Sequence, residues 1–297
     1  MSWKPIIVGV DGSAEAADAV AFGVAAARRA ATVCYLVYAA PDVPARGHDP
    51  YPYTRLDERA RAALLAALAN RVPAPPLTTL TVRRGPPAGV LREAVVARGA
   101  ELVVLGGKHH STLGRWLGGS TSVSVARSTL VPLLVTVGQP AIRRVLVAVD
   151  QSSAARPTLA AAERYVALFG AELRALSVIE PLPILLDTPQ PDKPDYYRLL
   201  EEKLADEIWP LIRAPGVDTL VRHGTALETI LHEAAEWRAD LLVVGSHGKG
   251  PVTRMIVGSV TERLINNLPT SLLVVPAGVA AIGPETREVM TVNEEET

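Results

Sequence analysis

The chain has 297 residues, of which 48% are hydrophobic and 21% are charged, and its formal net charge is −1. This length and composition are typical of a globular protein with two domains and exclude a disordered chain. The near-zero charge gives no electrostatic reason to expect nucleic acid or an anionic membrane as a partner. No apolar run reaches the roughly 18 residues that span a bilayer, and the N-terminus has no signal-peptide pattern. Because Cys34 is also the only cysteine, we expect a cytoplasmic protein.

The first half of the chain alternates apolar runs with segments of helical spacing. The apolar, β-branched runs predict buried strands at residues 6–11, 32–40, 77–85, 101–107 and 132–137. The segments between them predict helices at residues 13–30, about 55–71, 88–99 and from about Ser120. Ser13 is suited to the N-cap of the first helix, and Arg28 and Arg29 to its last turn. Cys34 lies in the second predicted strand, where we expect a small core residue.

The second half repeats this order at an offset of about 139 residues. "VGVDGS", which contains Asp11, returns as "VAVDQS", which contains Asp150. A constant offset over the whole chain indicates a duplicated domain, with the boundary in the short polar connection at residues 138–143. We therefore expect one domain at residues 1–139, a second at residues 140–278, and a mobile acidic tail at residues 279–297.

Continuous apolar strands separated by helices favour a parallel sheet that helices cover on both faces. Each half is thus predicted to be a five-stranded, doubly wound, Rossmann-like α/β domain. In such sheets, ligands bind beyond the carboxyl ends of the strands, where the strand order reverses. In the second half, Asp150 ends the first strand, Val178 lies at the end of the second, and the loop that begins at Gly245 follows the fourth. If the first and fourth strands are neighbours, these three converge on one crevice.

The segment "GSHGKGPVTRMIVGS", from Gly245 to Ser259, has groups that suit a polyphosphate. Gly245 and Gly248 allow positive φ and a close approach of backbone N–H groups to an anion. Ser259 follows Gly258 at the start of a predicted helix, whose free N–H groups and dipole favour negative charge. The alternative is a glycine-rich turn with a serine N-cap, which needs no ligand. The usual glycine patterns of nucleotide-binding loops are absent.

Two further signatures flank this loop, "VAVDQS" at residues 147–152 and "LSVIEP" at residues 176–181. With the spacing G-x2-G-x9-G-S of the loop, they resemble the universal stress protein family in its tandem two-domain form, over about residues 4–276. The loop is similar to that of the family's ATP-binding subgroup, and the resemblance implies the adenine nucleotide alpha hydrolase-like fold. "LSVIEP" departs from the family at Ser177, where histidine is usual.

The resemblance implies that the second half binds ATP. Asp150 would contact the ribose and adenine region, and the backbone of Val178 would meet the adenine. The ribose and phosphates would be held by Gly245, Gly248, Gly258 and Ser259, with a backbone N–H from Val260. His247 would face the ribose or a phosphate, with an exposed loop position as the alternative. Mg²⁺ beside the ATP is left open, because the sequence identifies no ligand set for the ion.

The first half keeps part of this pattern, namely Asp11, Gly106, Gly119 and Ser120. His109 replaces the counterpart of Gly248. A histidine at positive φ costs of order 1 kcal/mol, and its ring would fill space that phosphates need. Tyr38, aligned with Val178, also departs from the adenine signature. We therefore predict one strong nucleotide site in the second half and a weak or empty site in the first.

The resemblance implies a nucleotide-dependent regulator of a stress response that acts on an unidentified protein partner. A slow ATPase is one alternative, although only Asp150 supplies a carboxylate to the crevice and no catalytic base or metal ligand is identified. A nucleotide-free interaction scaffold is the other. The apolar last strands of the two halves, at residues 132–137 and 271–276, are expected to pair as a pseudo-dimer. A further homodimer is left open.

Overall fold

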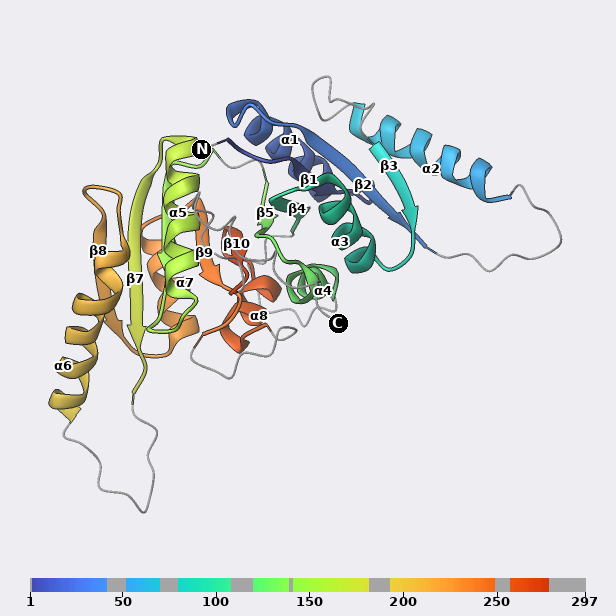
Figure 1. The fold of residues 1–297 in the computed structure, drawn as a ribbon. Helices are drawn as coiled ribbons and strands as arrows, with labels where there is room; N and C mark the ends of the chain where they lie inside the picture. Colours follow the sequence, from blue (N-terminus) through green and yellow to red (C-terminus); the bar gives the residue numbers. More distant parts are fainter. Residues whose placement is uncertain are drawn as a thin grey trace, which may run out of the picture.

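The computed structural model describes residues 2–41, 52–69, 80–107, 120–138, 141–181, 193–248 and 257–277. Strands and helices follow each other in the same order in both halves (Figure 1). The first half contains β1 (Ile6–Gly9), α1 (Ala14–Arg29), β2 (Cys34–Ala40), α2 (Pro52–Ala69), β3 (Leu80–Arg84), α3 (Pro87–Arg98), β4 (Leu102–Gly106), α4 (Ser120–Ser128) and β5 (Leu133–Thr136).

The second half contains β6 (Arg144–Ala148), α5 (Ala155–Phe169), β7 (Glu172–Ile179), α6 (Lys193–Lys203), β8 (Asp218–His223), α7 (Ala226–Glu236), β9 (Leu241–Gly245), α8 (Ser259–Asn266) and β10 (Ser271–Val275). A π-helical turn, η2 (Leu204–Ile208), and a 3-10 turn, η3 (Trp209–Leu211), continue α6 and have no counterpart in the sequence prediction. The predicted helix at 55–71 begins and ends slightly earlier, as α2.

In the described part of the chain, the strands form one ten-stranded sheet in the order β3-β2-β1-β4-β5-β10-β9-β6-β7-β8. Neighbouring strands within each half are parallel, and β5 pairs with β10 antiparallel. Leu134 lies opposite Leu273, so this pair marks a pseudo-two-fold axis between the halves. The predicted class, two tandem doubly wound α/β units, is confirmed.

Helices cover both faces of the sheet. One apolar core lies between the sheet and α1, α2, α5 and α6, and a second lies between the sheet and α3, α4, α7 and α8. Successive strand residues point to opposite faces, so Ile7 enters one core while Ile6 and Val8 enter the other, and all three are fully buried. Burial on both faces explains why the strands have continuous apolar sequences.

Local features of the first half agree with the sequence. The Ser13 side chain accepts a hydrogen bond from the backbone N–H of Ala16 and caps α1, whose last turn carries Arg28 and Arg29. Cys34 is 4% exposed, and burial raises the pKa of its thiol to about 12. It is therefore a core residue, as predicted. No helix in the described ranges is both long enough and apolar enough to cross a membrane.

A buried ion pair joins the two halves on the side of α1 and α5. The Glu101 side chain, at the start of β4, is 5% exposed, and its Oε1 lies 2.8 Å from Nη2 of Arg164 in α5. The same oxygen accepts the backbone N–H of Lys4 at 2.8 Å. The Arg164 guanidinium also lies over the Trp3 ring, 3.8 Å from its centroid. Glu101 thus ties the N-terminal segment to a helix of the second half.

We expect Glu101→Gln to lower the free energy of unfolding by about 2 kcal/mol, because Arg164 would lose its charged partner at a site where only 23% of its side chain is exposed. Urea unfolding measures the difference. Glu93→Gln, at an exposed position in α3, is the control and should change stability by less than about 0.5 kcal/mol. Equal stability of the two variants would show that the pair does not hold the halves together.

Candidate functional site

The strand order of the second half brings the predicted site residues to one edge of the sheet. β6 lies between β7 and β9, with Ala148 paired to Leu176 on one side and to Val244 on the other. Asp150, Val178 and the segment that begins at Gly245 follow or end these three strands. The first and fourth strands of this half, β6 and β9, are therefore neighbours, as a shared crevice requires. They lie at the point where the strand order reverses.

Gly248 lies directly against Asp150. A β-carbon built on Gly248 would lie 2.7 Å from Oδ2 of Asp150, which is too close for a side chain. The other carboxylate oxygen, Oδ1, accepts the backbone N–H of Ser152 at 3.0 Å, so the carboxylate is held in place. Any side chain at position 248 would have to displace the Asp150 carboxylate or the loop itself.

The two described glycines of this loop do not use the positive φ that glycine allows. Neither Gly245 nor Gly248 is among the described glycines with positive φ. At both positions the backbone instead comes close to neighbouring groups. A β-carbon on Gly245 would lie 3.1 Å from the His247 carbonyl oxygen and 3.2 Å from Thr158 in α5, so this glycine lets α5 pack tightly against the end of β9.

Ser246 closes the base of the loop. Its backbone N–H donates to the Val275 carbonyl at 2.7 Å, and its carbonyl accepts the Gly258 N–H at 2.8 Å, so the two ends of the loop are joined. Its hydroxyl oxygen accepts the Ala277 N–H at 3.2 Å and lies 2.9 Å from Nδ1 of His247. The base of the loop is therefore rigidly attached to both β10 and the residue before α8.

The two ring nitrogens of His247 differ in their contacts. Nδ1 is paired with the Ser246 hydroxyl, whereas Nε2 is buried and has no hydrogen-bond partner among the described residues. A buried polar atom in this state is destabilising, and an oxygen atom of a ligand would satisfy it. His247 is therefore not the exposed loop residue that the sequence analysis left as the alternative.

The structure does not have the serine N-cap that was part of the ligand-free alternative. Gly258 occupies the N-cap of α8, with φ −62° and ψ 150°, and Ser259 is the first helical residue. Because glycine has no side chain, the helix begins without a side-chain cap, and its first N–H groups lack intrahelical acceptors. Ser259 is exposed and Val260 is partly buried. This helix end therefore offers backbone N–H groups and a hydroxyl to an anion.

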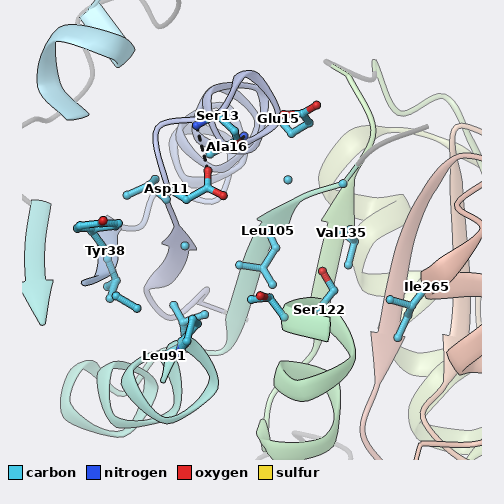
Figure 2. Close-up of a pocket in the computed structure, with 18 of the residues that line it drawn as sticks. Asp11, Ser13, Glu15, Ala16, Tyr38, Leu91, Leu105, Ser122, Val135 and Ile265 are labelled. Atoms are coloured by element: carbon cyan, nitrogen blue, oxygen red, sulfur yellow. Dashed lines mark hydrogen bonds between the residues drawn. The ribbon is translucent and has the colours of Figure 1, made fainter. Parts of the chain in front are cut away.

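The crevice of the first half contains a cavity of about 360 Å³. Figure 2 shows Asp11 and Glu15 on one side of it and Leu91, Leu105 and Ser122 on the other. It lies at the place that corresponds to the site of the second half, because β1 lies between β2 and β4. Gly119 and His109 lie outside the described residues, as does the side chain of Ser120, so the weak first site stays a prediction.

Gly106, the counterpart of Gly245, is required by packing. A β-carbon on Gly106 would lie 2.3 Å from the backbone carbon and oxygen of Glu15 at the start of α1. This approach lets α1 pack tightly against the end of β4. The glycine at this position is therefore explained in the first half without any ligand.

The register of the sheet corrects one residue match. The offset of about 139 residues holds in the pairing of β1 with β2 and of β6 with β7. Val178 therefore corresponds to Ala39, and the alignment of Val178 with Tyr38 is wrong. The second half has one residue more between β7 and Pro181 than the first half has between β2 and Pro41. This extra residue lies after the strands, where strand pairing no longer fixes the offset.

Comparison with known proteins agrees with the repeated fold. Residues 2–136 and 141–276 each match the Universal stress protein family. A universal stress protein from Mycolicibacterium smegmatis is 32% identical over 294 residues, covering 91% of this chain and 96% of that protein. One from Mycobacterium bovis is 29% identical, covering 88% and 93%. The solved structure of one from Archaeoglobus fulgidus has a TM-score of 0.58 at 21% identity, covers 92% of this chain and 96% of that chain, and shows likeness of fold.

We expect Gly106→Ala to lower the free energy of unfolding by about 2–3 kcal/mol, because the new methyl group would meet the backbone at the start of α1. Gly89→Ala is the matched control, because a β-carbon at this position in α3 has no neighbour within 4 Å. That change should leave stability equal or raise it by up to about 1 kcal/mol. Urea unfolding of both variants checks this, and a tolerated Gly106→Ala would contradict the packing explanation.

Proposed function

Because the chain belongs to the universal stress protein family, we propose that its second half binds ATP and that this binding regulates a stress response. The ligand would lie at the edge where β6, β7 and β9 end. The observation that carries the proposal is the contact of Gly248 with Asp150, because it positions a carboxylate beside a loop that ends at an open helix N-terminus.

The charges at this edge give the ligand one orientation. A carboxylate only accepts hydrogen bonds, so Asp150 suits the hydroxyl groups of a ribose and repels phosphate. The phosphates would instead lie at the N-terminus of α8, which Gly258, Ser259 and Val260 begin and where the helix dipole favours negative charge. The adenine then extends toward the backbone of Val178 at the end of β7.

The residues present fit such a ligand in two further respects. The unpaired Nε2 of His247 can donate to a ribose or phosphate oxygen once Nδ1 accepts from the Ser246 hydroxyl. Gly248 has no side chain that would push the Asp150 carboxylate away from the loop, whereas Gly245 is explained by its packing against α5. Bound nucleotide would supply binding free energy that shifts the protein between conformations or partners, and no chemical step is required of these residues.

We assign the nucleotide to the second half because, of the four motif residues Gly245, Gly248, Gly258 and Ser259, only Gly248 is not kept in the first half. Gly248 lies against Asp150, and the residues that match these two in the first half are His109 and Asp11. A histidine could make the same approach only by displacing the carboxylate or the loop, since even a β-carbon at position 248 would lie 2.7 Å from Oδ2 of Asp150. The first half would then serve chiefly as a partner: its β5 covers the edge of β10, as in a pseudo-dimer built into one chain.

Mass spectrometry of nucleotide released from the purified protein tests the proposal. Wild type should release ATP, and Gly248→His should release at least about tenfold less, because the ring displaces Asp150 and obstructs the loop. Glu93→His, which adds a histidine to the exposed face of α3, is the control and should retain ATP. Equal ATP content in Gly248→His and wild type would refute the assignment of this loop.

A further inference from the structure

The pseudo-two-fold axis relates α4 to α8, and the two helices pack against each other. The axis passes through the pair Leu134 and Leu273, and the pairs on either side of it are related by the same offset as the sequence repeat. Figure 1 shows α4 and α8 side by side below the junction of β5 and β10. α4 follows β4 and α8 follows β9, so the two helices have the same place in the repeat.

In the first half, this arrangement makes the crevice a shared one. The cavity beyond β1 and β4 is lined by Ile265 and Asn266 from the last turn of α8, and by Leu268 after it. Figure 2 shows Ile265 facing the cavity from the second half. The helix of one half thus forms a wall of the other half's crevice.

The same relation brings α4 to the crevice of the second half. The counterpart of Asn266 under the repeat is Arg127, in the last turn of α4. A direct contact supports this placement: Nη2 of Arg127 donates to both carboxylate oxygens of Glu262, at 3.1 and 3.0 Å. Glu262 lies in the first turn of α8, which begins at Ser259. Arg127 therefore lies at the helix end assigned to the phosphates.

The Arg127–Glu262 pair is weak enough for Arg127 to leave the Glu262 carboxylate and bind another anion. The two side chains are 47% and 37% exposed, and ion pairs with this exposure contribute little to stability. A polyphosphate carries more negative charge than one carboxylate and accepts several hydrogen bonds from a guanidinium. At the equivalent place in the first half's crevice, the second half supplies the neutral Asn266. Of these two equivalent positions, only the one at the second half's crevice therefore carries a positive charge.

We propose that Arg127, from the first half, binds the phosphates of the nucleotide in the second half and releases Glu262 when it does so. This inference rests on the proposed function, since it names a further residue of the same site. It also gives the first half a role in binding that does not depend on its own altered loop.

Calorimetric titration with ATP and with adenosine tests this role. We expect Arg127→Ala to weaken ATP binding about tenfold and to leave adenosine binding unchanged, because only the phosphates contact the guanidinium. Arg127→Lys should weaken ATP less than Arg127→Ala. Glu262→Gln should tighten ATP binding, because it removes the competing carboxylate. Arg92→Ala, at an exposed position of α3, is the matched control and should bind both ligands as wild type does.

Each contrary outcome has a distinct meaning. If Arg127→Ala binds ATP as tightly as Arg92→Ala, Arg127 is not a phosphate ligand, while the proposed function stands. If Arg127→Ala weakens ATP and adenosine equally, its role is to hold α4 against α8, and the inference fails. If wild type binds no ATP, the proposed function fails and this inference falls with it.

Discussion

The antiparallel pairing of β5 with β10 is the constraint on which the rest of the structure depends. It joins two five-stranded units into one sheet and removes the edge that each last strand would otherwise expose. The register around Leu134 and Leu273 also determines where the helices of one half lie on the other. The buried Glu101–Arg164 pair and the exposed Arg127–Glu262 pair both follow from this arrangement, on opposite faces of the sheet.

A chain of close contacts leads from this sheet to the candidate site. Because β6 lies between β7 and β9, Asp150 and the Gly248 loop end at the same edge, where glycine is the residue that fits against the carboxylate. In the described part of this segment, Nε2 of His247 is buried without a partner, and Gly258, which has no side chain, is the N-cap of α8. Recognition of a ribose and of phosphates would therefore rest on different ends of one short segment.

Much of this fold was predictable from sequence, because its signals are local. Strands buried on both faces have continuous apolar runs, and Ser13 caps its helix within four residues. The errors came from contacts between distant segments. The role of Gly248 depends on Asp150, and the match of Val178 to Ala39 depends on strand register. The contact of Arg127 with Glu262 depends on the pairing of the halves, and no sequence pattern indicated this contact.

The central claim is that the two halves share a fold and a sheet but differ in ligand binding because Gly248 is replaced by His109 in the first half. Calorimetric titration of the nucleotide-free, full-length protein with ATP measures this most directly, since it counts sites per chain. The account predicts saturation near one ATP per chain. Saturation near two would show that the first half binds equally well despite its histidine, and that result would contradict the account.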